Sequence, residues 1–257
     1  MATWEKELEI ASAAARKAAQ IAQEMQAGIV AEPKDDGSPV TAADKKCEAF
    51  IAAALHQAFP DDGLLGEEGT NVESRNGRRW IIDPIDGTRD YVRGTPLWAN
   101  LIGLEADGEV VAGVVNLPML GELYTASRAG GAFQNGNPIR VSNKTSFSES
   151  VLCVNGLNRF SDIPFRERLL EALPSFWAVR SLGGAPDAML VASGHADFWI
   201  EPKAAPWDLA PLKIIIEEAG GRFSDFQGRS TIFGGHCVAY APGLEPEVRA
   251  LMTEPRA

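Results

Sequence analysis

The segment Asp-Pro-Ile-Asp-Gly-Thr at residues 83–88 constrains this chain more than any other stretch of it. It follows three apolar residues, so we expect a buried strand that ends in a turn where two carboxylates appear. Asp83 and Asp86 offer oxygen ligands, which hard divalent cations prefer. Gly87 lets the backbone approach an anion, and Thr88 then begins a helix whose first N–H groups favour phosphate. One short segment therefore predicts both a metal site and a phosphate site.

Ordinary turn chemistry offers a second interpretation of segment 83–88. Asp-Pro and Asp-Gly are common turn dipeptides, and Thr88 could simply cap a helix. Either dipeptide alone favours that interpretation, whereas both together, with Gly-Thr behind them, favour the metal and phosphate site. A capping hydroxyl at a helix start is also well placed to position an attacking water, so the two roles of Thr88 are compatible.

Three further carboxylates have two interpretations each. Glu67 lies in the sequence Gly-Glu-Glu-Gly at residues 66–69, which is either a solvated acidic loop or a catalytic one. Asp208 follows Pro-Trp, and Asp44 follows Thr-Ala-Ala as in a capping box, so both could be helix caps. If these acids converge with segment 83–88, they cannot all be ionised unless a cation neutralises them. Convergence would therefore require a metal.

The whole chain is compatible with a cytoplasmic enzyme. Its 257 residues, of which 45% are hydrophobic, suffice for one large domain or two closely packed ones. A net charge of -11 argues against nucleic acid or an anionic membrane as partner, and no apolar run is long enough to predict a membrane span. The three cysteines, Cys47, Cys153 and Cys237, show no pairing pattern, so we expect reduced thiols and a cytoplasmic location.

The first half of the chain predicts two helices followed by antiparallel strands. Apolar residues recur at helical spacing over residues 4–26, and a second helix is predicted over 41–59. The polar segment 32–39 between them contains Gly and Pro and predicts a loop. Residues 97–105 and 109–117 are apolar and joined by Ala-Asp-Gly, which predicts a hairpin.

The second half predicts a different architecture. Residues 142–150 are rich in Ser, Asn and Thr, and we expect a domain boundary there. Beyond it, strand and helix patterns alternate, which predicts a mainly parallel sheet covered by helices. The fold class is therefore α/β: an α+β domain over 1–145 that carries the metal and phosphate site, and an α/β domain over 146–257 that supplies Asp208 and the substrate pocket.

Taken in order, these motifs resemble the inositol monophosphatase family of magnesium-dependent phosphatases. The matching segments are Val-Thr-Ala-Ala-Asp at 40–44, Gly-Glu-Glu at 66–68, the segment 83–88, Pro-Trp-Asp-Leu-Ala at 206–210 and Glu-Glu-Ala-Gly-Gly at 217–221. The similarity covers essentially the whole chain. It implies a layered αβαβα sandwich that forms a homodimer.

The resemblance also implies two or three Mg²⁺ ions in each site. Glu67, Asp83 and the carbonyl of Ile85 would hold the first ion. Asp83, Asp86 and Asp208 would hold the second, and Glu67 would help to hold a third through water.

The catalytic residues that the resemblance implies are Glu67, Thr88 and Asp44. Thr88, supported by Asp44, would orient and activate the attacking water. The backbone at Gly87 and Thr88 would hold the phosphate, and Lys34 lies in the loop that the family uses to cover the site.

Substrate contacts are implied on the other side of the site. Glu201 matches the position where the family contacts substrate hydroxyls or amines, and Arg-Ser-Leu-Gly-Gly-Ala at 180–185 matches the segment that lines the leaving-group pocket. The candidate substrate-binding residues are Gly87, Thr88, Arg180, Gly183, Ala185, Asp187, Glu201 and Asp208.

The run Arg-Asp-Tyr-Val-Arg-Gly-Thr-Pro-Leu-Trp at 89–98 is more similar to histidinol-phosphate phosphatases than to inositol phosphatases, which usually have an Asn-Phe-x-His-Gly-like run there. The histidinol branch often has an acid directly after the Gly-Gly pair; here that position is Ala185, and the nearest acid is Asp187.

We therefore expect a Mg²⁺-dependent phosphomonoesterase that acts on a small phosphorylated metabolite. Histidinol phosphate is the first candidate, inositol monophosphate the alternative, and a sugar bisphosphate or a nucleotide 3′-phosphate comes next. A non-catalytic metal-binding scaffold is least favoured, because binding alone needs no water activator such as Thr88.

Overall fold

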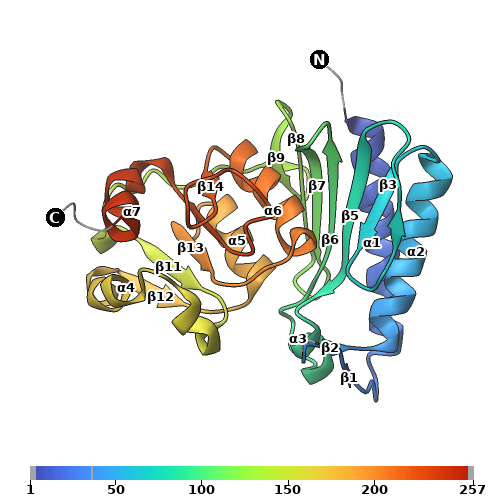
Figure 1. Cartoon of the computed structure of the whole chain (residues 1–257), viewed down its shortest axis with the longest axis horizontal. Helices are drawn as coiled ribbons and strands as arrows, with labels where there is room; N and C mark the ends of the chain where they lie inside the picture. Colours follow the sequence, from blue (N-terminus) through green and yellow to red (C-terminus); the bar gives the residue numbers. More distant parts are fainter. Residues whose placement is uncertain (1–3, 36, 254–257) are drawn as a thin grey trace.

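The computed structural model of the protein describes residues 4–35 and 37–253 as five alternating layers of helices and sheets (Figure 1). Two long helices cover one face of an eight-stranded sheet, two helices lie between this sheet and a five-stranded sheet, and two short helices cover the far face. From the first layer to the last, the helices are α1 (Glu5–Met25), α2 (Ala42–Ala58), α5 (Gly184–Ala192), α6 (Pro206–Glu218), α4 (Arg166–Ala172) and α7 (Glu245–Met252). The predicted αβαβα sandwich is confirmed.

The eight-stranded sheet has the order β10-β9-β8-β7-β6-β5-β3-β4 and is antiparallel except where β3 pairs with β5. Its strands are β3 (Gly63–Gly66), β4 (Asn71–Val72), β5 (Arg78–Asp86), β6 (Ala99–Ala106), β7 (Glu109–Leu117), β8 (Glu122–Ser127), β9 (Gly131–Gln134) and β10 (Asn137–Pro138). The predicted hairpin is confirmed as β6 and β7.

The five-stranded sheet has the order β12-β11-β13-β15-β14. Its strands are β11 (Val151–Val154), β12 (Ala178–Arg180), β13 (Phe198–Glu201), β14 (Arg222–Ser224) and β15 (Cys237–Tyr240). The prediction of a mainly parallel sheet is correct only for β12, β11 and β13, because β15 is antiparallel to both of its neighbours. The chain returns from β14 to β15 through a loop without a crossover helix, and such a return reverses the strand direction.

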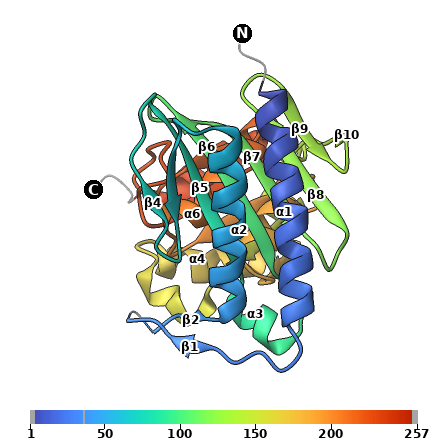
Figure 2. The same ribbon diagram turned by 90° about the vertical axis from the view of Figure 1, so that its right-hand side faces the viewer.

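The two predicted N-terminal helices are confirmed and lie side by side on the sheet (Figure 2). The buried face of α1 is built of alanines, whose small side chains let it lie close to α2 and β7. Helix α2 begins with the predicted capping box, in which Thr41 accepts from the backbone of Asp44 and the Asp44 carboxylate accepts from the backbone of Thr41.

Several short elements complete the chain. Within the predicted loop 32–39, β1 (Glu32–Pro33) pairs with β2 (Pro39–Val40), and α3 (Thr88–Arg93) begins at the predicted residue. Helix α7 was not predicted, because eight residues give only about two turns of apolar periodicity. The 3₁₀ helices of the described part are Phe147–Glu149, Leu157–Asp162, Leu173–Ser175 and Pro242–Leu244.

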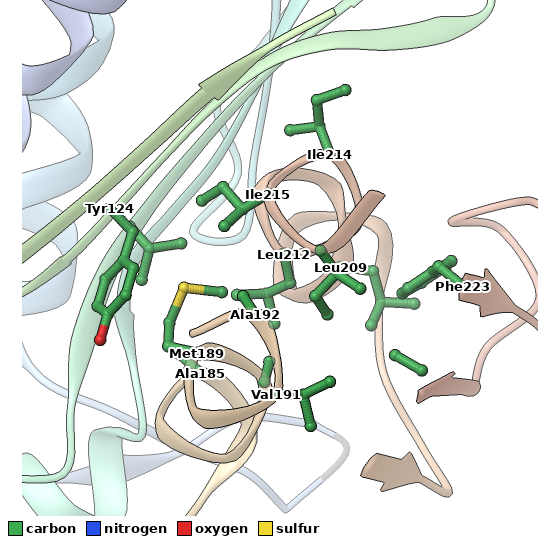
Figure 3. Packing of buried hydrophobic residues seen from close by; sticks show 14 of the residues in the cluster. Tyr124, Ala185, Met189, Val191, Ala192, Leu209, Leu212, Ile214, Ile215 and Phe223 are labelled. Atoms are coloured by element: carbon green, nitrogen blue, oxygen red, sulfur yellow. The ribbon is translucent and has the colours of Figure 1, made fainter. Parts of the chain in front are cut away.

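Helices α5 and α6 form the central layer and contribute to one hydrophobic core with both sheets (Figure 3). Two glycines let α6 lie directly on the eight-stranded sheet. A Cβ at Gly103 would lie 2.7 Å from the Ala210 Cβ, and one at Gly113 would lie 2.6 Å from the Ile214 Cγ2. This close packing holds the first turn of α6 at the end of β5. The division of the chain at residues 145 and 146 stays a prediction, since the two halves share this core.

The cysteines are buried and free, in keeping with the predicted reduced thiols. Within residues 4–35 and 37–253, every helix is too short or too polar to cross a membrane.

Candidate active site

Segment 83–88 opens into a cavity of about 330 Å³ that residues of both halves of the chain line. The cavity lies where β5 ends, α3, α5 and α6 begin, and β13 ends. The predicted site residues that line it are Glu67, Asp83, Ile85, Asp86, Gly87, Thr88, Gly183, Ala185, Glu201 and Asp208. Residues far apart in sequence are therefore brought to one place, as the metal hypothesis requires.

Three carboxylates form the core of the site. Asp83, Asp86 and Asp208 each offer an oxygen, and these oxygens all lie within 4.8 Å of one another. The first two end β5, and the third lies in the first turn of α6. The Asp208 Oδ2 also accepts a hydrogen bond from the backbone N–H of Ala205 at 2.7 Å. Both interpretations of Asp208 are thus correct, because it caps its own helix and joins the cluster.

The cluster carries more negative charge than the protein neutralises. Burial and the charges of Glu67, Asp86 and Asp208 raise the pKa of Asp83 well above its usual range. Burial also raises the pKa of Asp86 to about 6, and burial together with the charge of Asp86 raises that of Asp208 to about 8. No Lys or Arg among the described residues forms an ion pair with these three carboxylates. A set of buried, unneutralised carboxylate oxygens fits a hard divalent cation.

The backbone of segment 83–88 forms a bulge that sets the positions of Asp83 and Asp86. Asp83 pairs with Leu101 and Asp86 with Ala99, so β5 has one residue more than β6 between the two pairs. The Ile85 N–H donates to the Asp83 Oδ1 at 2.9 Å. This local bond fixes the orientation of the Asp83 carboxylate.

Thr88 and Asp44 form the predicted pair beside the cluster. The Thr88 Oγ1 lies 3.2 Å from the Asp44 Oδ1 and also 3.2 Å from the carbonyl oxygen of Ile85. Asp44 does not line the cavity; it is fully buried behind Thr88, and its other oxygen accepts from the backbone and hydroxyl of Thr41. Burial raises the pKa of Asp44 although the bonds from Thr41 lower it.

Gly87 allows the chain to turn from β5 into α3. Its φ of 81° lies in the left-handed region, and a Cβ there would lie 2.8 Å from the carbonyl oxygen of Leu97. A side chain at this position would therefore displace the backbone next to the cavity.

Glu67 reaches the cavity from a loop that a buried carboxylate holds in place. The Glu48 carboxylate accepts from the backbone N–H groups of Glu68 at 2.7 Å and Thr70 at 2.9 Å. The Lys34 Nζ donates to the Glu67 Oε1 at 2.7 Å and to the Glu68 Oε1 at 2.6 Å. Burial alone would lower the pKa of Lys34, but these two carboxylates raise it above its ordinary value. Sequence reasoning missed Glu48, although it lies one helical turn after Asp44.

The rest of the cavity lining carries charges of both signs. The Glu201 carboxylate is 5% exposed and accepts from the Asn155 Nδ2 at 2.6 Å. Burial, with smaller contributions from the charges of Asp208 and Asp86, raises the pKa of Glu201 well above its ordinary value. Further lining residues that were not predicted are Arg89, Asp90, Asn155, Asn158, Arg159 and Lys203. Only Arg89 and Asp90, which follow segment 83–88 directly, had a nearby sequence signal.

The sequence profile of the inositol monophosphatase family matches residues 3–253. The chain belongs to this family. A histidinol-phosphatase of Chlorobaculum parvum is 43% identical over 208 residues, which are 81% of this chain and 80% of the relative. An inositol-1-monophosphatase of Mesorhizobium japonicum is 39% identical over 224 residues, which are 85% and 83% of the two chains. An IMPase structure from Thermotoga maritima covers 97% of this chain and is itself covered to 97%, with a TM-score of 0.85 and 30% identity.

This member of the inositol monophosphatase family is accordingly a phosphoric monoester hydrolase. The family is generally metal-dependent, and the cluster of Asp83, Asp86 and Asp208 gives this chain a set of ligands that fits a metal.

Two residues predicted to contact substrate lie outside the cavity lining of this phosphatase. Asp187 is fully buried, and its carboxylate accepts from the backbone N–H groups of Leu182 and Gly183. Burial raises the pKa of Asp187 to about 6. Arg180 is exposed and donates to the carbonyl of Val179. Their predicted contacts with substrate stay predictions. In the structure, Asp187 fixes the loop before α5.

That loop links the second half of the chain to the metal cluster. The backbone N–H of Ala185 donates to the Asp86 Oδ2 at 3.1 Å, while Gly183 and Ala185 line the cavity. The first turn of α5 therefore holds a carboxylate of β5 in place.

Proposed function

We propose that this phosphatase hydrolyses histidinol phosphate in a Mg²⁺-dependent reaction. The observation that carries the proposal is the meeting of two features in one cavity. The carboxylates of Asp83, Asp86 and Asp208 line the cavity together with Thr88, and the buried Glu201 carboxylate lines the same cavity.

Two or three Mg²⁺ ions are the proposed cofactors. Glu67, Asp83 and the Ile85 carbonyl would hold one ion, and Asp83, Asp86 and Asp208 a second, with Glu67 helping to hold a third. When bound, Mg²⁺ supplies positive charge that acidifies water and offsets the charge on the phosphoryl oxygens and the leaving alkoxide.

Thr88 and Asp44 have the proposed role of positioning the attacking water. If the Thr88 hydroxyl donates to Asp44, its oxygen accepts a hydrogen bond from water and turns the water lone pair toward phosphorus. Attack forms one P–O bond as the bond to the leaving alkoxide breaks, and the proton that the water loses passes through solvent to the alkoxide. The backbone at Gly87 and Thr88 is the proposed cradle for the phosphate.

Glu201 has the proposed role of recognising the leaving group. Histidinol carries an ammonium and an imidazole that is a cation when protonated. Either cation would offset the charge that is costly to bury at Glu201. Gly183 and Ala185 would form the wall of the pocket, because they line the cavity without bulky side chains. The similarity to the Chlorobaculum parvum histidinol-phosphatase supports this choice of substrate.

We also propose that the enzyme is a cytoplasmic homodimer. The strand β12 lies at the edge of its sheet, where Trp177 is 71% exposed and Val179 is 37% exposed. An edge strand beside exposed apolar side chains is a surface that a second copy could cover.

Phosphate release tests the substrate proposal. Histidinol phosphate, inositol 1-phosphate, fructose 1,6-bisphosphate and adenosine 3′,5′-bisphosphate would be compared with and without Mg²⁺. The expected result is the highest kcat/KM for histidinol phosphate and no turnover in EDTA. Inositol monophosphate is the second candidate because of the Mesorhizobium japonicum relative, and a preference for it would overturn the substrate proposal. Absence of turnover on all four would instead favour a non-catalytic metal-binding role.

A further inference from the structure

Two asparagines form a buried polar pair on an otherwise apolar face of the sheet. Asn100 of β6 and Asn116 of β7 are 0% and 6% exposed and lie directly opposite each other. The next pairs along the same face, Ile102 with Val114 and Leu104 with Ala112, are apolar and belong to the core under α1 and α2. Two apolar side chains would fill this buried position equally well. The presence of two amides here therefore needs an explanation other than packing.

The explanation lies in the bulge of β5. Asn100 is the residue of β6 between Leu101 and Ala99, which pair with Asp83 and Asp86, so Asn100 faces the bulge. Its Nδ2 donates to the carbonyl oxygen of Pro84 at 2.7 Å.

The remaining polar groups of the bulge have side-chain partners too. Pro84 has no N–H to donate, the Ile85 N–H donates to Asp83, and the Ile85 carbonyl lies 3.2 Å from the Thr88 hydroxyl. Only the Pro84 carbonyl depends on a side chain from another strand. Without Asn100 this buried oxygen would lack that partner.

Asn116 fixes the orientation of Asn100. The Asn116 Nδ2 donates to the Asn100 Oδ1 at 3.0 Å and lies 3.5 Å from the carbonyl oxygen of Ala15 in α1. Because its oxygen is engaged in this way, the Asn100 amide presents its N–H₂ group to the bulge. A chain of hydrogen bonds thus runs from the first helical layer to the back of the acidic cluster.

We propose that Asn100 and Asn116 are positioning residues that hold the bulge so that Asp83 and the Ile85 carbonyl face the metal site. This inference rests on the proposed function, since it assumes that Asp83 and Ile85 are metal ligands. The pair touches neither substrate nor metal and acts through the backbone of Pro84.

Calorimetric titration of Mg²⁺ into the purified full chain tests the inference, and it does not depend on turnover. Asn100→Ala should raise the Kd for Mg²⁺ by about 10- to 100-fold, as loss of a group that orients a metal ligand does elsewhere. Asn116→Ala should raise the Kd less. The Asn100 Nδ2 can still donate to the Pro84 carbonyl, but the hydrogen bond from Asn116 that orients the Asn100 amide is lost. The effect of Asn116→Ala should vanish in the Asn100→Ala background, since both act through one bond.

Val114→Ala is the matched control, because Val114 is a fully buried residue of β7 on the same face. It should lower the melting temperature and leave the Kd for Mg²⁺ unchanged. An unchanged Kd in Asn100→Ala, or an equal rise in Val114→Ala, would overturn the inference. If Asn100→Ala does not fold, the Kd for Mg²⁺ of Asn116→Ala is compared with that of Val114→Ala. A rise in Asn116→Ala alone would support the inference, and equal values would overturn it.

Asp83→Asn separates this inference from the proposed function. A strong loss of Mg²⁺ binding in Asp83→Asn without one in Asn100→Ala would refute only the positioning role. Unchanged binding in Asp83→Asn would refute the ligand assignment on which both depend.

Discussion

Two parts of the cavity lining, the acidic end with its carboxylate cluster and the remaining residues, differ in how rigidly the fold holds their side chains. At the acidic end, Asp83 and Asp86 lie in a bulge of a central strand, and Asp208 caps a helix that packs directly on the sheet. In the rest of the lining, here called the open end, Arg89, Asn158 and Lys203 are exposed, and Asn158 belongs to a short 3₁₀ segment. The acidic end is fixed by backbone geometry on several sides, whereas the open end includes side chains that meet solvent.

This difference matches the different structural requirements of catalysis and of substrate selection. Metal and phosphate chemistry needs ligand positions held to within a fraction of an ångström, which strands and helix starts provide. Discrimination between leaving groups tolerates, and even benefits from, loop residues that change without disturbing the core. We therefore expect substitutions at the acidic end to affect kcat strongly and those at the open end to alter substrate preference mildly.

The largest effect is expected from the carboxylates. Asp86→Asn and Asp208→Asn should each lower kcat by about 10³-fold or more, because metal stabilisation of the transition state contributes several kcal/mol. Both variants should stay folded, since removal of one negative charge relieves repulsion in the cluster. Steady-state kinetics and circular dichroism check this prediction. Unfolding of both variants would favour the alternative that these residues are mainly caps.

Thr88→Ala should have the next largest effect. Loss of the hydroxyl beside Asp44 should lower kcat by about 10²- to 10⁴-fold, the usual contribution of general acid–base catalysis. Thr88→Ser, which keeps the hydroxyl, is the control and should retain most of the activity. Mg²⁺ affinity, measured by calorimetry, should change little in either variant. Full activity in Thr88→Ala would refute the assigned role in positioning water.

A pH dependence should follow from the raised pKa values in the cluster. In the metal-free protein, Asp208 with a pKa of about 8 and Asp86 with a pKa of about 6 keep protons that the unfolded chain releases near pH 4. The metal-free protein should therefore lose stability as the pH rises from about 4 to about 8. Mg²⁺ affinity should rise over the same range, by about tenfold per pH unit for each proton released.

Melting curves and Mg²⁺ titrations at pH 6, 7 and 8 measure both effects. Asp208→Asn is the control, because it should weaken the pH dependence near pH 8, where Asp208 releases its proton. Mg²⁺ affinity that is constant with pH would show that the cluster is already ionised in the metal-free protein.

The smallest effects are expected at the open end. Glu201→Gln should lower kcat/KM for histidinol phosphate relative to inositol 1-phosphate by about tenfold or more, since a charged hydrogen bond contributes roughly 1.5–3 kcal/mol. Lys203→Ala is the exposed control and should change the same ratio by less than about fivefold. Equal effects of the two variants would remove the distinction between a buried recognition residue and a solvent-exposed rim.

Much of the acidic end could be predicted from the sequence because its chemistry is local. The end of a strand, a turn, a glycine and a helix start follow one another within segment 83–88, and the capping box of α2 placed Asp44. The same local reasoning predicted the β6–β7 hairpin and the helices α1 and α2. It failed for β14 and β15, whose antiparallel pairing depends on the path of the chain between them.

Asp187 and Arg180 show that position in the sequence is not sufficient to predict which side chains line the cavity. Each lies near the Gly-Gly turn in sequence, yet Asp187 is fully buried, Arg180 is exposed, and neither lines the cavity. Contact with a ligand depends on which face of a turn a side chain occupies, and sequence proximity does not determine that face.

The sequence by itself predicted which residues form the site and indicated a family of metal-dependent phosphatases, because ligand types and turn residues are set within a few neighbouring positions. Only the tertiary structure decided that Asp208 reaches Asp83, that Glu48 holds the Glu67 loop, and that the amide of Asn100 meets the carbonyl of Pro84. These contacts join residues that are distant in sequence. They exist because packing of α6, α2 and β6 against β5 brings the groups together, and no local pattern encodes that packing.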